Sequence, residues 1–475
     1  MHKDHTDNPP NLTFNNKICM IGFGSVGQAV LPLIFRHIKV LPSQVTIISK
    51  KDDGRQTAKE FGAEFIQDSL TRDNYERILS ERVKSGDFLL NLSVDVSSHD
   101  LLEYCQKHGV LYLDTCVEPW AGGYTDSELH VTRRSNYALR AEALALRKPG
   151  KHATAVLTHG ANPGLVSHLV KQALLNIAFD NNMQITEPTT REEWAALSQK
   201  LNIKAIHIAE RDTQVAKVAK RAGEFVNTWS VDGFVSEGCQ PAELGWGTHE
   251  EELPEGGSQH ETGCRSAIYM NRPGASTRVR TWTPLAGAFH AFLITHSEAI
   301  SIASYLSVKE GEKVTYRPTC HYAYHPCNDA VLSVHELAGR EWDQQPDQRL
   351  IFDEITDGMD ELGVLLMGNK KGAYWYGSQL TIHEARKLAP NNNATSMQIS
   401  SSTLAGMMWA MANPEAGIVE PEEMDFRYVL GICTPYLGTV SGHYTDWTPL
   451  QEREKLFPES INNDDPWQFK NILVS

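Results

Sequence analysis

The stretch KICMIGFGSVGQAVLPL, residues 17–33, begins with a short apolar run and continues through the pattern G-x-G-x-x-G. In such a pattern the first glycine, Gly22, allows a tight turn, and Gly24 lets the backbone approach a pyrophosphate. Gly27 lets the following helix pack closely on the strand, and the N-terminus of that helix attracts the phosphate charge. We therefore predict a dinucleotide-binding turn made of Gly22, Phe23, Gly24, Ser25, Val26 and Gly27.

The sequence around this turn predicts an α/β fold. The apolar runs KICMI, QVTIIS, AEFIQ, DFLLNLS and VLYLDT alternate with amphipathic segments up to about residue 158, which favours a Rossmann-type doubly wound parallel sheet. We assign residues 14–160 to this domain and expect a buried helix near 395–415 to complete it. Residues 161–394 and 416–475 are strand-rich and predict a second, mixed α/β (α+β) domain that binds the substrate.

Composition limits the partners of the chain. Its 475 residues carry 44 basic and 59 acidic side chains, a formal charge of −15, which disfavours nucleic acid and anionic membranes and favours cations such as amines. The eight cysteines are scattered, as is typical of reduced thiols. The N-terminal stretch has no apolar core like that of a signal peptide, and no run is long enough to span a membrane. We expect a cytoplasmic protein with no nucleic-acid or membrane partner.

The end of the second predicted strand leaves the form of the dinucleotide open. A typical NAD site has an acid there that binds the ribose hydroxyls, but this strand ends in Ser49, followed by Lys50 and Lys51. Ser49 can hydrogen-bond a ribose, whereas the two lysines can hold the 2′-phosphate of NADP. Both interpretations stand on the sequence alone.

Polar residues follow the later strands of the predicted sheet. Ligands bind outside the carboxyl ends of parallel strands, so residues there are candidates for the site. The competing interpretation is that they cap strands and form turns. The candidates are Ser93, Asp95, Thr115, Glu118, Asn162 and Pro163.

Several acids and a tryptophan lie in the apolar sequence of the second domain. A buried carboxylate without a cation is costly, so Glu210 and Glu237 predict a cationic substrate. Trp229 can add a cation–π contact of about 2 kcal/mol, although residue type alone favours a core position. His296 follows a strand in the segment LITHSEAIS, at the first turn of a predicted helix, where a neutral imidazole can act as a base or serve the structure.

The segment TCHYAYHPC, residues 319–327, raises the question of a metal. Two cysteines and two histidines lie within eight residues, whereas zinc sites normally use two separated pairs of ligands. We therefore predict no metal site.

Six segments together resemble the bacterial homospermidine synthase family, a relative of the saccharopine dehydrogenase type of two-domain enzyme. They are MIGFGSVGQAVLPLI, HGANPGLVSH, ERDTQ, NTWSVDGFVSEG, LITHSEAIS and DELGVLL. The resemblance implies a homodimer that uses its second domain for dimerisation and a bound NAD that ends each turnover unchanged. It also implies the joining of two putrescines, or of spermidine and putrescine, into homospermidine, with release of ammonia or diaminopropane.

The resemblance also implies roles for individual residues. Glu210 and Glu237 are expected to bind ammonium groups, Trp229 to stabilise a cationic amine, Asn162 to orient the reacting nitrogen, and His296 to place the substrate or move a proton. Asp95 and Glu118 match the family less specifically and complete the expected catalytic set.

Two other functions compete with this one. An NADP-dependent reductase of the saccharopine or carboxynorspermidine type must hold a carboxylate, so it should place arginines at the strand ends. A dinucleotide sensor without catalysis would need no acids or tryptophan facing the cofactor. The acidic candidates favour a substrate that carries only amines.

Overall fold

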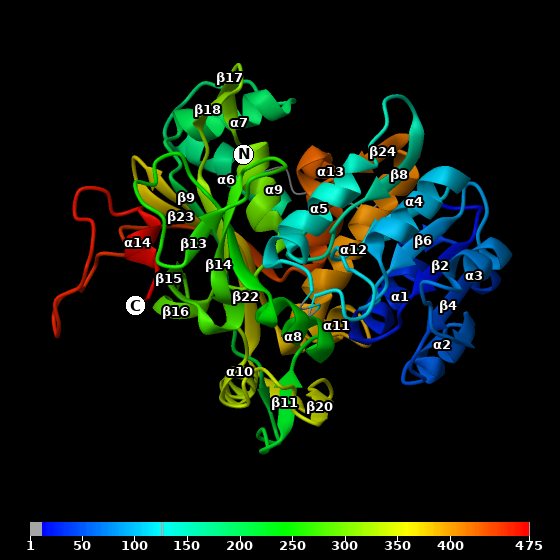
Figure 1. The fold of residues 1–475 in the computed structure, drawn as a ribbon. Coiled ribbons are helices and arrows are strands. Elements are labelled where there is room, and N and C mark those ends of the chain that lie inside the picture. The colour runs from blue at the N-terminus through cyan, green and yellow to red at the C-terminus, as the bar shows by residue number, and fades with distance from the viewer. Residues whose placement is uncertain (1–11, 125, 127, 475) are drawn as a thin grey trace.

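The computed structural model describes residues 12–124, 126 and 128–474 and contains two large sheets (Figure 1). The first sheet has seven parallel strands in the order β24-β8-β7-β6-β2-β4-β5. These are β2 (Ile18–Ile21), β4 (Val45–Ser49), β5 (Glu64–Gln67), β6 (Phe88–Asn91), β7 (Leu111–Asp114), β8 (His152–Val156) and β24 (Ala416–Val419). The chain runs from β2 outward to β4 and β5 and then returns to β6 on the other side of β2. This reversal is the switch point at which α/β sheets bind ligands, and the predicted doubly wound sheet is confirmed.

Helices cover both faces of this sheet. They are α1 (Ser25–His37), α2 (Arg55–Glu60), α3 (Tyr75–Arg82), α4 (Ser98–His108) and α5 (Asn136–Ala145). Successive residues of a strand point to opposite faces, so Met20 packs in one apolar core with Val30 of α1, while Cys19 packs in another with Leu101 of α4. Burial on both faces explains why the strands are continuous apolar runs.

The second sheet has ten strands and is mixed. Its strands are β9 (Ala205–Asp212), β12 (Pro241–Gly245), β13 (Gly257–Gln259), β14 (Ala267–Pro273), β15 (Arg278–Thr283), β16 (Gly287–Phe292), β19 (Thr319–His325), β22 (Met359–Asn369), β23 (Gly372–Thr381) and β25 (Thr439–Thr445). β9 pairs in parallel with β19 and antiparallel with β22, and β22 and β23 form the antiparallel pair expected from the sequence. The mixed second domain is therefore confirmed.

The remaining elements surround this sheet or connect it to the first. The helices are α6 (Leu165–Asp180), α7 (Arg191–Lys200), α8 (Val231–Cys239), α9 (Ser297–Tyr305), α10 (Asn328–Gly339), α11 (Ile382–Leu388), α12 (Ala394–Ala412), α13 (Phe426–Cys433) and α14 (Phe469–Ile472). Short strand pairs are β1 (Leu12–Thr13) with β3 (Ile38–Lys39), β10 (Val215–Ala216) with β21 (Ile355–Asp357), β11 (Glu224–Asn227) with β20 (Asp347–Leu350), and β17 (Val308–Glu310) with β18 (Lys313–Tyr316). Among the described residues no helix is long and apolar enough to cross a membrane.

Two segments from the last quarter of the chain return to the first domain. The buried helix expected near 395–415 is α12, which contacts α1, β7 and β8 on one side and β22 on the other (orange in Figure 1). Directly after it, β24 pairs in parallel with β8 at the edge of the first sheet. Residues 416–475 were expected in the second domain, and this strand is not visible in the sequence because four residues carry no periodic pattern.

Candidate active site

The glycine turn has the shape that a pyrophosphate requires. Gly22 has a φ of 84°, and a Cβ on it would lie 2.7 Å from the carbonyl carbon of Leu92 on the neighbouring strand end. At Gly24 the space within 4 Å of such a Cβ is free, so the backbone is open to a ligand. α1 begins at Ser25 without a side-chain cap, so its first N–H groups are available to a phosphate. These features fit a bound dinucleotide.

A cavity of about 110 Å³ lies beyond this turn, between the two domains. It is bounded by the strand ends of β6 and β7, by the loop after β8, and by residues of β9, β19, α8 and α12. The predicted residues that line it are Val26, Ser93, Thr115, Glu118, Asn162, Pro163, Glu210, Trp229, Glu237 and His296. Residues more than 200 positions apart in the sequence therefore meet at one site.

Glu210 is held at the bottom of this cavity by two donors. Its Oε2 accepts hydrogen bonds from the Tyr322 hydroxyl at 2.6 Å and from Asn162 Nδ2 at 3.1 Å. Asn162 precedes Pro163, to which it is joined by a cis peptide bond. Burial raises the pKa of Glu210 to about 8, although both hydrogen bonds oppose this shift. An ammonium group beside Glu210 would restore the charged form.

His296 lies between two carboxylates. Its Nε2 is 2.9 Å from Glu237 Oε2, and its Nδ1 is 3.2 Å from Glu298 Oε1. Burial alone would lower the pKa of His296, but the charges of Glu298 and Glu237 outweigh it and raise the pKa to about 10. With this pKa the imidazole is protonated at neutral pH, which disfavours the role of a neutral base.

Glu298 is a site residue that the sequence analysis missed. The sequence predicts a helix that begins around His296, and the structure has His296 at the N-cap of α9 and Glu298 in its first turn. Glu298 is 1 % exposed, and its carboxylate contacts the imidazole of His296 and orients it. Its position two residues after His296, in a buried helix, was the available signal.

Trp229 is half-buried and lines the cavity. Its Nε1 donates to the Tyr324 hydroxyl at 3.1 Å, and its ring packs against Phe234 with the centroids 5.7 Å apart. These contacts fix the orientation of the indole, which is the condition for a useful cation–π contact. By contrast, Trp375 is fully buried and belongs to the core of the second domain.

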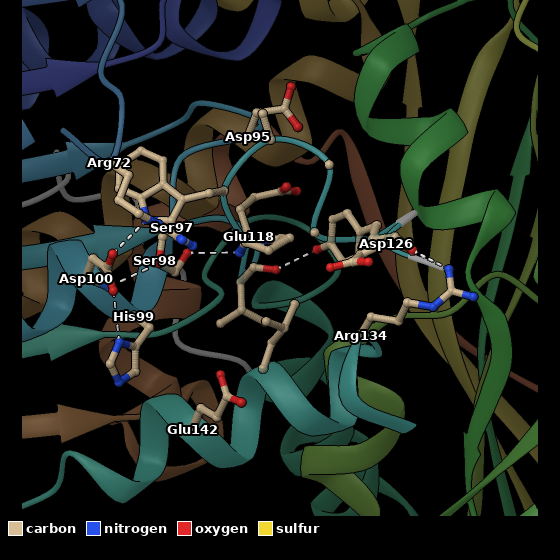
Figure 2. A pocket seen from close by; sticks show the side chains of 18 of the residues that line it. Arg72, Asp95, Ser97, Ser98, His99, Asp100, Glu118, Asp126, Arg134 and Glu142 are labelled. Atoms are coloured by element: carbon tan, nitrogen blue, oxygen red, sulfur yellow. Dashed lines mark hydrogen bonds and ion pairs between the residues drawn. The ribbon is translucent and has the colours of Figure 1, made fainter. Parts of the chain in front are cut away.

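Glu118 lies between this cavity and a larger one of about 820 Å³ (Figure 2). Its backbone N–H donates to Ser98 Oγ at 3.0 Å, and the Cys116 thiol donates to its Oε1 at 3.3 Å. Its Oε2 is buried without a partner among the described residues, and burial raises its pKa to about 8. Asp95 lines the larger cavity and not the smaller one. Glu118 is thus the carboxyl shared by both spaces.

The structure shows the surroundings of Ser49 and Lys51, at the end of β4, and of the segment TCHYAYHPC, in β19. Ser49 is buried at the end of β4, and the exposed Lys51 lies 3.4 Å from Asp232. In β19, Cys320 and His321 point to opposite faces of the sheet because neighbours in a strand alternate. Cys320 and His321 therefore cannot bind the same ion, and the described residues contain no cluster that could hold a metal.

The charge balance of the smaller cavity is its most informative property. Three carboxyl groups line it, from Glu118, Glu210 and Glu237, and His296 is the one cationic side chain among its described lining residues. Among the described lining residues there is no lysine or arginine. A substrate carboxylate would find only His296, which is already bound to Glu237 and Glu298, whereas an amine would find three carboxyl groups.

Comparison with known proteins gives the family. The saccharopine dehydrogenase NADP-binding domain model matches residues 18–157, and the saccharopine dehydrogenase C-terminal domain model matches residues 160–446. Homospermidine synthase from Blastochloris viridis is 55% identical over 99% of both chains, and that from Mesorhizobium japonicum is 53% identical over 96% of both. The chain belongs to the homospermidine synthase family.

Solved structures agree with this membership. The crystal structure of the homospermidine synthase from Legionella pneumophila, in complex with NAD, has a TM-score of 0.93 and 50% identity over 98% of this chain and 100% of that one. Yeast saccharopine dehydrogenase has a TM-score of 0.50 at 10% identity, with 91% of this chain and 100% of that one covered. The second likeness shows the fold alone.

Proposed function

We propose that this protein is an NAD-dependent transferase that joins two putrescines, or spermidine and putrescine, into homospermidine. Ammonia or diaminopropane leaves. The observation that carries the proposal is the cavity beside the glycine turn, which has three carboxyl groups and no lysine or arginine among its described lining residues. When bound, NAD supplies hydride removal from the carbon next to an amine and hydride return to the new imine, so the reaction has no net redox change.

The chain's own residues supply binding and orientation. Glu210 and Glu237 bind ammonium groups, and the Trp229 ring stabilises a cationic amine or iminium. Asn162, held at 3.1 Å from Glu210, orients the reacting nitrogen. His296 is protonated and therefore keeps Glu237 in place as a hydrogen-bond donor rather than acting as the base. Asp95 and Glu118 contribute acidic groups along the larger cavity.

The reacting amine must lose a proton before the hydride can leave. Alkylamines, like the lysine side chain, have a pKa near 10.4, so at neutral pH both ends of putrescine are charged. The site must therefore hold one end as an ammonium and accept a proton from the other. Glu118, whose pKa of about 8 lies near neutrality, suits such exchange, while Glu210 holds the ammonium end.

The test is to incubate the purified protein with putrescine and catalytic NAD, and to measure amines and ammonia by mass spectrometry. Reduced nicotinamide is followed by absorbance at the same time. We expect homospermidine and ammonia in equal amounts without net NADH. Stoichiometric NADH, or no product until NADPH and a keto acid are supplied, would instead identify a saccharopine-type reductase and contradict the proposal.

Assembly and location belong to the same proposal. We expect a homodimer, on the resemblance to the family, and a cytoplasmic protein whose eight cysteines are all free thiols in the structure. Light scattering of the purified protein tests the dimer, and a mass of one chain would contradict it.

A further inference from the structure

Two tyrosines of β19 contact several residues of the smaller cavity. Tyr322 and Tyr324 are two positions apart on this strand, so their side chains point to the same face of the sheet. β19 pairs in parallel with β9, and Tyr324 lies directly opposite Glu210 in that pairing. Both tyrosines are buried, and Tyr322 lines the cavity. We call Tyr322 and Tyr324 the tyrosine pair.

The rings of the tyrosine pair are fixed by their packing. They stack on each other with the centroids 5.1 Å apart and the planes 15° from parallel. The Tyr322 ring also packs against the His296 imidazole, with the centroids 4.4 Å apart. The Tyr324 ring meets Phe234 edge-on at 5.6 Å. This packing determines where the two hydroxyl groups lie.

The Tyr322 hydroxyl donates to a carboxylate. Its hydrogen bond to Glu210 Oε2 is 2.6 Å long, and Asn162 Nδ2 donates to the same oxygen at 3.1 Å. Two donors use the two lone pairs of this oxygen, so Oε1 is the Glu210 oxygen left for an ammonium group. Burial and the negative charge of Glu210 raise the pKa of the Tyr322 hydroxyl, which therefore stays a neutral donor.

The Tyr324 hydroxyl has a different partner. It accepts a hydrogen bond from Trp229 Nε1 at 3.1 Å, and both of these groups are neutral. Trp229 lines the cavity, whereas Tyr324 is not among its described lining residues. Tyr324 therefore acts on a ligand in the cavity through the orientation of the Trp229 ring.

The surroundings of Glu210 make its hydrogen-bond donors important. Burial is the main cause that raises its pKa to about 8, and the charge of Asp212 on the same strand adds to it. Asp360 on β22 is itself kept neutral by burial and by these two acids. The hydrogen bond from Tyr322 is the largest opposing contribution, ahead of the charge of His296 at the N-cap of α9. Glu210 therefore depends on the Tyr322 hydroxyl to ionise.

We propose that the tyrosine pair positions the amine-binding groups of the cavity. Tyr322 holds the Glu210 carboxylate for an ammonium group, and Tyr324 holds the Trp229 ring for a cationic amine. This inference rests on the proposed function, because it takes an amine as the ligand. Tyr322 stabilises a charge, whereas Tyr324 stabilises an orientation. Removing the first hydroxyl should therefore give a defect that depends on pH, and removing the second should give one that does not.

The first experiment measures how tightly Tyr322→Phe binds putrescine. The protein is loaded with NADH, which cannot accept a hydride, so the amine binds without reacting. Isothermal titration calorimetry gives the Kd at several pH values. We expect a Kd about 30-fold above wild type at pH 7 and only about fourfold above it at pH 9, where Glu210 ionises more readily. The amine itself titrates equally in both proteins, so the ratio of the two Kd values reports Glu210.

The second experiment applies the same titration to Tyr324→Phe. A hydrogen bond between neutral groups is lost, so the Kd should rise by about fivefold, with the same ratio to wild type at every pH. The fluorescence of Trp229, isolated by subtracting the spectrum of Trp229→Phe, should change in Tyr324→Phe and stay unchanged in Tyr322→Phe. This measurement needs no turnover.

Tyr374 offers a matched control. It is buried on β23 of the same sheet, its hydroxyl accepts from Asn176 Nδ2 at 3.0 Å, and it is not among the described lining residues of the cavity. Tyr374→Phe should bind putrescine like wild type at every pH. The thermal midpoints of the three variants, measured alongside, show how much of any defect comes from lost stability.

Three results would overturn the proposal. They are a Tyr322→Phe Kd within twofold of wild type at pH 7, a Tyr322→Phe ratio that is the same at every pH, or a Tyr324→Phe ratio that changes with pH in the same way. Failure of the proposed function is seen in wild type alone, which would then form no homospermidine. A wild type that binds no putrescine would overturn both.

Discussion

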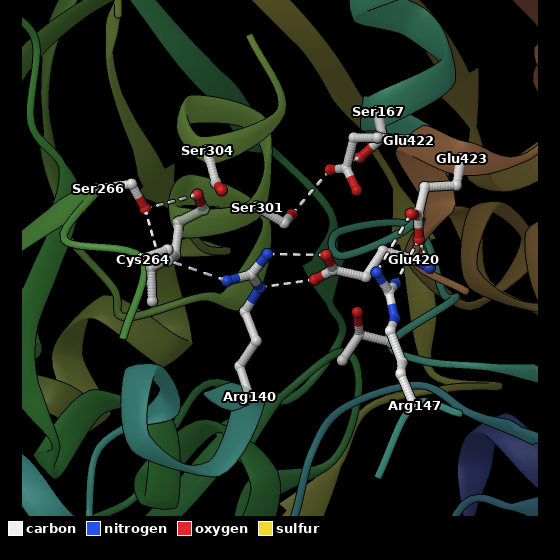
Figure 3. Close-up of polar contacts among 12 residues, drawn as sticks. Arg140, Arg147, Ser167, Cys264, Ser266, Ser301, Ser304, Glu420, Glu422 and Glu423 are labelled. Carbon is white, nitrogen blue, oxygen red and sulfur yellow. Dashed lines mark hydrogen bonds and ion pairs between the residues drawn. The ribbon is translucent and has the colours of Figure 1, made fainter. Parts of the chain in front are cut away.

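Two sets of acids lie where the two domains meet, and their charges are balanced in different ways. Along the segment after β24, Glu420 is bound by Arg140 through two hydrogen bonds of 2.6 and 2.7 Å, and Glu423 pairs with Arg147 (Figure 3). In the cavity, neither Glu118 nor Glu210 has an ion pair with a lysine or arginine among the described residues. We call the first set the clasp.

The two sets differ in the source of the charge that balances them. A buried carboxylate deprived of its cation costs about 3 to 5 kcal/mol, so the clasp carries its arginines within the chain. The cavity acids instead raise their pKa values and leave room for a cation from outside. Unpaired acids next to a dinucleotide turn thus indicate an amine substrate.

The largest expected effect comes from removing a cavity carboxylate. Glu237→Gln should lower kcat/KM for putrescine by about 1000-fold, because about 4 kcal/mol of interaction with the ammonium and with His296 is lost. Bound NAD, measured by its absorbance after gel filtration, should stay at the wild-type level. Arg140→Met is the matched control at the clasp. It should lower the free energy of unfolding while leaving the activity of the folded fraction unchanged. Unchanged turnover in Glu237→Gln would remove Glu237 from the mechanism.

A smaller loss of kcat/KM is expected from removing the Trp229 ring. Trp229→Ala should reduce kcat/KM by about 30-fold, as a cation–π contact of about 2 kcal/mol disappears. Trp229→Phe should recover part of this loss because a ring remains. Since Trp229 is only half-buried, the thermal midpoint should fall far less than in Trp375→Ala, where a fully buried ring is removed. Proportional losses of stability and activity would favour a core role.

The comparison also predicts how stability depends on pH. Glu118 and Glu210 bind protons more tightly in the folded state, with pKa values near 8 against 4.5 unfolded, so their contribution to stability falls as the pH rises from 4.5 to 8. His296, at about 10 against 6.5, loses its contribution between pH 6.5 and 10. The thermal midpoint should therefore fall by about 5 °C from pH 6 to 9. Putrescine should reduce that fall, and a midpoint that rises with pH would contradict these shifts.

Much of this site could be predicted because its signals are local in sequence. A few neighbouring residues are enough to recognise the glycine turn, the strand ends, and the acids of ERDTQ and NTWSVDGFVSEG. The contact of Tyr322 with Glu210 could not be found this way, since the pairing of β19 with β9 brings these residues together across 112 positions. The charge of His296 was equally hidden, because it depends on Glu237, 59 positions earlier in the chain. Sequence patterns identify helices and strands, whereas pKa values depend on contacts between residues that are far apart in the sequence.

The smallest expected effect concerns the exposed ion pair beside the cofactor turn. Lys51 and Asp232 are 3.4 Å apart, with 63% and 43% of their side chains exposed, and such pairs contribute about 0 to 1 kcal/mol. If NAD is the cofactor, Lys51→Ala should change its KM by less than about twofold. An NADP enzyme would use this lysine on the 2′-phosphate, and the KM for NADP would then rise at least tenfold, equivalent to about 1.4 kcal/mol. Measuring the KM for NAD and for NADP in wild type and in Lys51→Ala therefore tests whether Lys51 binds the cofactor. The cavity acids, in contrast, are proposed to bind the substrate.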